Sequence, residues 1–325
     1  MGMRWLVTGG AGYIGAHVVH ALQATGNDVV VGDDLSTGIA ARLPQDVPLE
    51  RLDVCDLSAV GEAMSRHRPD GVIHLAARKD VAESTRQPLR YYQQNLDGLR
   101  SVLHAVAAHK VKHVLFSSSA AVYGNPVRPG PILETAFTKP ENPYGRTKLI
   151  GEWLLRDAAA SAGFSWAALR YFNVAGAGSA ALADSGLTNL VPRLLKAVKE
   201  GSSATVYGGD YPTRDGSAIR DYVHVCDVAE AHVQAALALA GGALRADVLN
   251  VGRGTGASVL EMINAVVRAC GAPLSYVVGP RREGDPGEVV ASVGEIAKKV
   301  GWAARFGLDD IVASAAGHFA LASAV

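Results

Sequence analysis

The sequence is poor in cysteine and has nothing that resembles a leader segment. Its three cysteines, Cys55, Cys226 and Cys270, are odd in number, far apart and without the spacing of metal ligands. They argue against a disulfide framework, give no sign of a metal site, and indicate reduced thiols in a cytoplasmic protein. The first apolar run begins almost at the start of the sequence, so we expect no signal peptide.

The chain also lacks net charge and long apolar runs. Its 31 Lys and Arg residues balance 31 Asp and Glu residues. We therefore expect no nucleic-acid partner and no acidic membrane surface as a partner. No apolar run approaches the length that spans a bilayer, and there is no internal repeat. With 325 residues, 49% of them hydrophobic, the chain can form one large or two modest domains with a buried core.

What the sequence does contain is a glycine-rich stretch, TGGAGYIG, between an apolar run and a helical pattern over 16–22. Gly9 permits a sharp turn, Gly12 leaves no Cβ between the backbone and a pyrophosphate, and Gly15 allows the helix to lie close to the strand. The first-turn N–H groups of such a helix favour an anion. Because the spacing is not that of the commoner Gly-x-Gly-x-x-Gly fingerprint, an ordinary glycine-rich turn is an equally good interpretation of this stretch alone.

An acidic pair, Asp33 and Asp34, ends the next apolar run. A carboxylate at this position can accept hydrogen bonds from both ribose hydroxyls of an adenosine and would repel a 2′-phosphate. The pair therefore favours a dinucleotide site and predicts NAD as the cofactor, not NADP. The alternative is an aspartate that caps a loop.

Apolar runs alternate with helical patterns through the first half of the chain. We expect further strands at 48–54, 71–77, 111–116 and 165–170. Small residues at the end of the second of these suit a cofactor lying across the strand. The alternation predicts an α/β fold built on a Rossmann-type, doubly wound parallel sheet.

Past Asn173 the pattern becomes irregular, and we predict a smaller C-terminal α/β substrate domain. The predicted division is an NAD-binding Rossmann domain over 1–175 and a substrate-binding domain over 176–325, with 224–256 able to pack back on the first.

Three polar residues form the predicted catalytic group. Ser119 follows the strand at 111–116, and the Asn-Pro cap of the next helix places Tyr144 and Lys148 four residues apart on one face. A tyrosine has a pKa of about 10, and a neighbouring ammonium together with a positive nicotinamide ring would lower it toward neutrality. Ser119 can bond the substrate oxygen. The alternative is a Tyr and a Lys that merely share a helix face.

Taken together, these stretches resemble the extended short-chain dehydrogenase/reductases and, within them, the UDP-glucose 4-epimerases. The matching segments run almost from end to end: TGGAGYIG, HLAARKDVAES, YYQQN, FSSSAAVYG, NPYGRTK, LRYFN, TNLVP, DYPTRDGSAIRDYVHV and PRREGD. The first of them and the Tyr-x-x-x-Lys pattern are widely shared, whereas the last two are far more specific to nucleotide-sugar epimerases.

The resemblance implies epimerisation at C4 of a UDP-hexose through transient hydride transfer to bound NAD. It implies that Tyr144 is the base, that Lys148 lowers its pKa, and that Ser119 passes the proton. The implied cofactor-binding residues are Gly9, Gly12, Tyr13, Ile14, Gly15, Asp33, Asp34, Ser36, Asp53, Val54, Leu75, Ala76, Ala77, Lys79, Asn95, Tyr144, Lys148 and Tyr171. The implied UDP-sugar-binding residues are Ser119, Asn173, Asn189, Leu190, Thr205, Tyr207, Arg220, Arg282, Asp285 and Val289.

Departures from the family pattern affect the choice of sugar more than the reaction. Val174 follows Asn173 where proline is common, Thr188 replaces the first of two asparagines, and Val289 stands where members restricted to glucose and galactose carry a tyrosine. We therefore expect action on UDP-Glc/UDP-Gal and also on UDP-GlcNAc/UDP-GalNAc.

Two other functions stay open at this point. A nucleotide-sugar 4,6-dehydratase would need an Asp-Glu pair after Ser119, where the chain has Ala120 and Ala121. A non-catalytic NAD-sensing protein would not need the intact Tyr144 and Lys148.

A homodimer is expected because the helices predicted at 89–108 and 144–160 carry more apolar residues than one sheet face needs.

Overall fold

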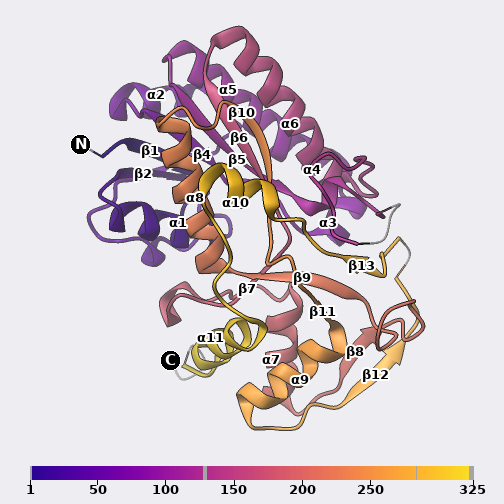
Figure 1. Ribbon diagram of the computed structural model, residues 1–325. Coiled ribbons are helices and arrows are strands. Elements are labelled where there is room, and N and C mark those ends of the chain that lie inside the picture. The colour runs from indigo at the N-terminus through magenta and orange to yellow at the C-terminus, as the bar shows by residue number, and fades with distance from the viewer. Residues whose placement is uncertain (1, 127–129, 283, 322–325) are drawn as a thin grey trace.

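A seven-stranded parallel sheet organises the first lobe of the molecule (Figure 1), with strand order β10-β6-β5-β4-β1-β2-β3. The computed structural model describes residues 2–126, 130–282 and 284–321. The strands are β1 (Arg4–Thr8), β2 (Asp28–Asp33), β3 (Leu49–Arg51), β4 (Gly71–His74), β5 (His113–Ser119), β6 (Ser165–Tyr171) and β10 (Ala246–Val251). The order reverses between β1 and β4, the switch point at which doubly wound sheets bind their ligands.

Helices cover both faces of this sheet and bury two separate cores. One face is covered by α1 (Tyr13–Ala24), α8 (Val225–Ala240) and α10 (Gly294–Val300). The other is covered by α2 (Leu57–His67), α5 (Gly98–Ala108) and α6 (Pro143–Ala162). Because both faces are buried, the central strands read as continuous apolar runs, as in the buried triplet at 29–31.

Local sequence signals fix the helix ends that matter for the site. Asn142 caps α6, its Oδ1 accepting the N–H of Gly145 at 2.9 Å, and Pro143 occupies the first helical position. The helix ends at Gly163 in the left-handed conformation. The cap therefore sets where Tyr144 and Lys148 lie.

In the part of the chain that the structure describes, small sheets and the helices α7, α9 and α11 form the second lobe (Figure 1). One sheet holds β7 (Asn173–Ala175), β9 (Ile219–His224), β11 (Gly256–Ser258) and β13 (Glu288–Val289), and the other pairs β8 (Ala204–Tyr207) with β12 (Tyr276–Gly279). The helices are α7 (Leu190–Glu200), α9 (Val259–Cys270) and α11 (Leu308–Leu321), which share one apolar cluster with β8. Shorter elements are α3 (Val81–Arg86), α4 (Pro88–Tyr92) and the single turns η1 (Ala40–Arg42), η3 (Ala120–Val122) and η4 (Ala180–Leu182).

Several elements differ from the expectation. The strands predicted at 48–54 and 71–77 are shorter, because the chain turns into loops at the carboxyl edge of the sheet. The helix predicted over 89–108 consists of α4, a π turn η2 (Gln93–Asp97) and α5. The wide turn places Asn95 where its side chain bonds the backbone of Arg78. The late strand β10 pairs with β6 in the first sheet, while the predicted boundary after residue 175 stays a prediction.

None of the helices formed by the described residues is long and apolar enough to cross a membrane.

Candidate active site

The glycine-rich stretch forms a tight corner between β1 and α1. Gly9 has a φ of +72°, and a Cβ there would lie 2.6 Å from the backbone nitrogen of Ala76. A Cβ on Gly15 would lie 2.1 Å from the carbonyl oxygen of Gly9. Gly12 caps α1 without a side chain, and the first turn of α1 contains no acid. The corner therefore suits the phosphates of a dinucleotide, which bind at such helix N-termini.

The acidic pair lies beside this corner. Asp33 is buried, and its carboxylate accepts the N–H of Ala11 at 3.0 Å and that of Leu35 at 2.9 Å. Burial raises the pKa of Asp33, while these two hydrogen bonds lower it. Asp34 is exposed and bonds the backbone and hydroxyl of Ser36. The Asp33 carboxylate thus joins the glycine corner to the loop that follows β2.

Other residues expected at the cofactor lie at the carboxyl edge of the same sheet. The loop after β4 begins at Leu75, whose N–H bonds the carbonyl of Thr8. Lys79 is exposed, with its Nζ 5.9 Å from the ring centroid of Tyr13. The remaining residues lie in this loop, in the first turn of α1 and in the loop after β3: Ala76, Ala77, Ile14, Asp53 and Val54.

The side chains of Asn95 and Tyr171 are already engaged within the protein. Besides its bonds to Arg78, Asn95 donates to Oγ1 of Thr147 at 3.0 Å. The Tyr171 hydroxyl is hydrogen-bonded to Nε2 of His232. The polar groups of both side chains are therefore occupied within the protein. Contacts with a cofactor are left to the ring of Tyr171 and to backbone groups.

The predicted catalytic residues meet at the end of β5. Ser119 is the last residue of this strand, and Tyr144 and Lys148 lie one turn apart on α6, which packs against it. The Lys148 amine is buried and donates to the carbonyl of Ser117 at 2.7 Å. It lies 5.9 Å from the ring centroid of Tyr144, and Ser119 lies near enough to that phenol to lower its pKa.

The expected lowering of the Tyr144 pKa is not found in the protein on its own. Burial raises this pKa, and the hydrogen bond from Ser119 only partly opposes the rise. Burial also lowers the pKa of Lys148 to about 7, so the ammonium that should stabilise the phenolate is itself disfavoured. Desolvation therefore favours the uncharged form of both groups.

Sequence reasoning missed a buried ion pair beneath this group. Arg170 on β6 forms two hydrogen bonds with Glu152 on α6, at 2.9 Å and 2.6 Å. Ser118 donates to the same carboxylate at 2.5 Å, and Arg170 also donates to the hydroxyl of Tyr123 at 2.9 Å. A charged pair buried next to Ser119 fixes α6 against β5, because leaving either partner unpaired would be costly. Arg170, a charged residue within a mostly apolar predicted strand, was the sequence signal for this pair.

In the second lobe the structure pairs the predicted substrate residues with one another. Arg220 on β9 forms an ion pair with Asp285. The guanidinium of Arg282 lies 3.8 Å from the ring centroid of Tyr207, at the end of β8. Guanidinium groups bind diphosphates well, and an exposed aromatic ring can stack on a base. The pairing thus gathers donors and a stacking surface in one region.

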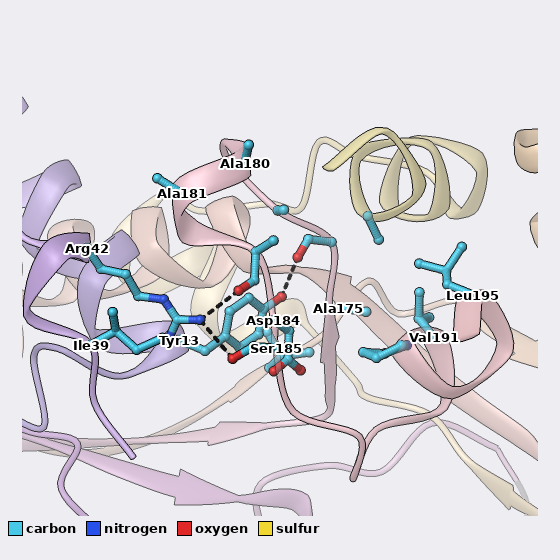
Figure 2. A pocket seen from close by; sticks show the side chains of 16 residues that line it. Tyr13, Ile39, Arg42, Ala175, Ala180, Ala181, Asp184, Ser185, Val191 and Leu195 are labelled. Carbon is cyan, nitrogen blue, oxygen red and sulfur yellow. Dashed lines mark hydrogen bonds between the residues drawn. The ribbon is translucent and has the colours of Figure 1, made fainter. Parts of the chain in front are cut away.

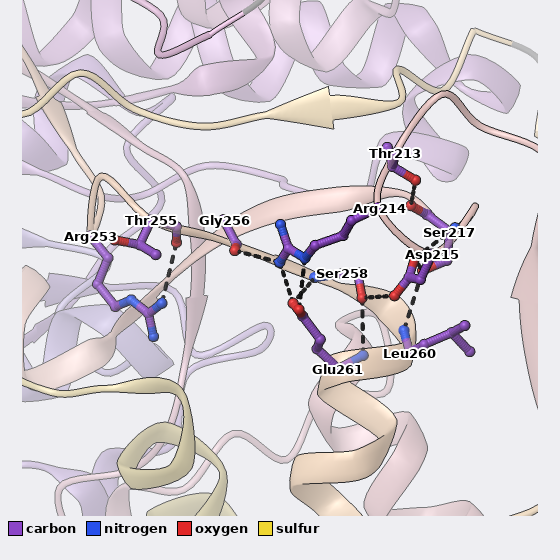
Figure 3. Close-up of polar contacts among 10 residues, drawn as sticks. All are labelled: Thr213, Arg214, Asp215, Ser217, Arg253, Thr255, Gly256, Ser258, Leu260 and Glu261. Atoms are coloured by element: carbon purple, nitrogen blue, oxygen red, sulfur yellow. Dashed lines mark hydrogen bonds and ion pairs between the residues drawn. The ribbon is translucent and has the colours of Figure 1, made fainter.

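The loop that joins β8 to β9 is tied to the start of α9 (Figure 3). Arg214 forms an ion pair with Glu261 and donates to the carbonyl of Gly256 at 2.9 Å. Asp215 accepts a hydrogen bond from Ser258, the residue that caps α9. These contacts hold the loop between Tyr207 and Arg220 from one side.

Asn173 and Val289, two further predicted substrate residues, lie on strands that pair with β9. Asn173 is exposed at the start of β7, which pairs with β9. Val289 on β13 lies next to Arg220 in register and packs in a cluster with Leu149 and Phe172 of the first lobe.

The other predicted substrate residues lie at element ends. Asn189 precedes α7 and donates to Asp184 at 2.8 Å. Leu190 opens α7 and is half-buried, and Thr205 is exposed on β8.

A cavity of about 360 Å³ lies between α1 and the loop after β7 (Figure 2). Its walls are mostly small apolar side chains, and the polar side chains among them are those of Tyr13, Arg42, Asp184 and Ser185. Arg42 donates to the carbonyl of Ala183 at 2.7 Å. The short Gly/Ala/Ser loop over 176–186 thus leaves open space beside the cofactor corner.

Comparison with known proteins gives a consistent result. The model of the family described as NAD dependent epimerase/dehydratase matches residues 5–252. The chain is 42% identical over 320 residues to a UDP-glucose 4-epimerase of Azospirillum brasilense, covering 96% of this chain and 90% of that protein. It is similar to the structure of a UDP-glucose 4-epimerase from Stenotrophomonas maltophila with bound NAD and formylated UDP-arabinopyranose, with a TM-score of 0.94 and 38% identity over 99% of this chain and 100% of that one. A UDP-Glc/GlcNAc 4-epimerase of Campylobacter jejuni is similar with a TM-score of 0.88 and 33% identity over 98% and 100% of the two chains.

Proposed function

Because the chain belongs to the NAD-dependent epimerase/dehydratase family, we propose that it is an epimerase that inverts C4 of a UDP-hexose with NAD as its resident cofactor. The observation that carries this proposal is the meeting of Tyr144, Lys148 and Ser119 at the carboxyl edge of a sheet that also carries the glycine corner. NAD, when bound, accepts a hydride from C4 of the sugar and returns it to the opposite face.

The chain's own residues handle the proton. Tyr144 takes the proton of the 4-hydroxyl and later gives it back, while Ser119 bonds the sugar oxygen and the phenol. Lys148 is held by the carbonyl of Ser117 and supplies positive charge near the phenol when it is protonated. General acid–base help of this kind contributes about 10² to 10⁴ in rate.

The glycine corner and Asp33 fit NAD. The corner leaves room for a pyrophosphate, and a buried carboxylate beside it disfavours a 2′-phosphate. We assign the diphosphate of the UDP-sugar to Arg220 and Arg282, and the uracil to the ring of Tyr207. A cytoplasmic location and a homodimer belong to the same proposal.

The alternatives have less support. A 4,6-dehydratase needs an acid and a base beside Tyr144, and η3 places only Ala120 and Ala121 there. A sensor without catalysis would not need both Tyr144 and Lys148 to be intact. The similar proteins described above are epimerases, which favours the same choice.

The proposal is tested by incubating the purified protein with UDP-galactose and no added cofactor. We expect UDP-glucose to form, because the NAD bound during expression is regenerated in each cycle. No conversion of UDP-galactose, or conversion only after NADP is added, would contradict the proposal.

A further inference from the structure

Side chains from two distant helices hold the loop 176–178 that follows β7. The phenol of Tyr13 donates to the carbonyl of the first residue at 2.5 Å, as Figure 2 shows from the cavity side. Oγ of Ser314 accepts the N–H of the second residue at 3.2 Å. Nε2 of His17 accepts the N–H of the third at 2.9 Å. Tyr13 and His17 belong to α1 and Ser314 to α11, so this loop connects the cofactor corner to the second lobe.

The loop accepts these contacts because its residues are small. Gly176 has a φ of +92°, and a Cβ there would lie 2.7 Å from the ring of His224. A Cβ on Gly178 would lie 3.0 Å from the ring of His17. A loop of Gly and Ala has no polar side chains of its own to fix it, so its position depends on its neighbours.

The protonation state of His17 follows from its partners. Its Nδ1 lies 2.8 Å from the carbonyl of Tyr13, which can only accept, while its Nε2 faces a backbone N–H, which can only donate. Only the neutral ring with hydrogen on Nδ1 satisfies both bonds. The ring is 4% exposed, and burial agrees by lowering its pKa to about 4.

A second histidine orders Ser314 in the same way. Nδ1 of His224 accepts the N–H of Cys226 at 3.0 Å, so its Nε2 carries the hydrogen and donates to Oγ of Ser314 at 2.9 Å. The Ser314 hydroxyl in turn donates to the carbonyl of Ile311 at 3.0 Å. Its oxygen is thereby aimed at the loop, and every bond in the network has a defined direction.

We propose that Tyr13, His17 and Ser314 form a latch that positions the strand β7, and with it Asn173, against the cofactor corner. This inference rests on the proposed function, in which Asn173 holds the sugar over the cofactor. Transfer between sugar and cofactor needs their reacting atoms in near contact, so a latch joining the two binding elements acts on kcat. His17 and Ser314 are positioning residues, since they reach the sugar only through the backbone of the loop.

Amide hydrogen exchange measures the latch directly. We compare the protein with His17→Leu, which removes the acceptor, and with His17→Gln, whose carbonyl can replace Nε2. Exchange over 176–178 should be at least roughly tenfold faster in His17→Leu and close to wild type in His17→Gln. Ser314→Ala, a small change on a different helix, should also speed exchange there, and His104→Leu on the exposed side of α5 is the matched control.

Kinetics with UDP-galactose connect the latch to the reaction. His17→Leu should lower kcat by roughly 10- to 100-fold with little change in KM, and His17→Gln should recover most of kcat. Equal kcat and equal exchange in wild type, His17→Leu and Ser314→Ala would overturn the latch, as would a loss that His17→Gln does not relieve. If wild type itself converts no UDP-galactose, the proposed function fails, while the exchange result still decides whether the latch exists.

Discussion

Tyr144 and Lys148 lie at the centre of the proposed chemistry, and burial disfavours the charged form of both side chains. It raises the pKa of the phenol and lowers that of the amine to about 7, so burial favours the uncharged form of each. The Ser119 hydrogen bond opposes this for the phenol, and the positive charge of NAD is the further contribution we expect. We therefore expect Tyr144 to become a competent proton acceptor only when the cofactor is in place.

Removing the phenol oxygen should abolish turnover and spare binding. Tyr144→Phe should lower kcat by about 10² to 10⁴ or more, because only the proton acceptor is lost. Affinity for UDP, measured by calorimetry, should stay close to wild type. A variant that keeps a tenth or more of wild-type turnover would show that another group is the base.

Val289 should set the range of sugars. Its side chain packs in a cluster with Leu149 and Phe172, and we expect the larger ring of Val289→Tyr not to fit there and to turn toward the sugar. Wild type should convert both UDP-galactose and UDP-GalNAc, and Val289→Tyr should keep the first activity and lose the second, because a wall rejects a larger substituent by clash. Paired assays on the two substrates check this. A wild type inactive on UDP-GalNAc, or a variant still active on it, would contradict this assignment.

At the scale of elements, the loop between β8 and β9 is braced on both sides. Arg281 stacks on Tyr211, with its guanidinium 4.2 Å from the ring centroid, and Arg214 pairs with Glu261 at the start of α9. Arg214 and Glu261 are both partly exposed, and exposed ion pairs contribute at most about 1 kcal/mol to stability. The brace therefore matters for where the loop lies more than for folding.

We predict that Arg214→Ala raises KM for UDP-galactose severalfold and leaves kcat and the melting temperature almost unchanged. The reason is that the loop joins Tyr207 to Arg220, which are expected to bind UDP, and carries no group that reacts. Steady-state kinetics and a thermal melt of the same sample provide the check, with exposed Arg156→Ala on α6 as the matched control. A fall in kcat as large as the fall in kcat/KM would contradict this role.

Some elements of this fold are predictable from the sequence and others are not. The first sheet and α6 are predictable, because buried parallel strands read as apolar runs and Asn142-Pro143 marks a helix start. The small sheet of β7, β9, β11 and β13 is not, since its short strands are brought together only by tertiary packing. The π turn at Asn95 and the Glu152–Arg170 pair likewise depend on contacts between distant segments. Roles for Arg282 and Asp285 came from the family resemblance, because a charge run otherwise indicates a solvated surface.

For the whole molecule, we expect a homodimer formed through α4 and α6. These helices pack together, and Leu89 is 82% exposed and Trp153 49% exposed. Leu149 and Leu154 of α6, by contrast, pack within the protomer, so the interface we expect does not include them. Light scattering at micromolar concentration should give the mass of a dimer, and Leu89→Glu combined with Trp153→Glu should give that of a monomer. A monomeric wild type would contradict the dimer.

Acid should destabilise the molecule through its buried histidines. Burial lowers the pKa of His17 from 6.5 to about 4 in the folded protein, and the neighbouring His224, His20 and Arg42 contribute to this by disfavouring another positive charge. Above pH 6.5 the ring is neutral in both the folded and the unfolded protein. Between pH 6.5 and 4 only the unfolded chain takes up the proton, so the free energy of unfolding decreases as the pH is lowered. At about 1.4 kcal/mol per pKa unit, this residue accounts for roughly 3 kcal/mol.

The comparison with His17→Gln isolates that contribution, because glutamine does not titrate. Denaturant melts between pH 7.5 and 4 should give a flatter dependence for the variant than for wild type. Parallel curves for the two proteins would show that His17 does not titrate between the folded and unfolded states.

The central claim is that the hydrogen at C4 is removed and returned within one active site. It is tested most directly with UDP-galactose deuterated at C4, incubated with the purified protein in ordinary water and followed by NMR and mass spectrometry. The account predicts UDP-glucose that keeps its deuterium at C4, because the transferred hydrogen never exchanges with solvent. UDP-glucose with solvent hydrogen at C4, or no UDP-glucose at all, would contradict it.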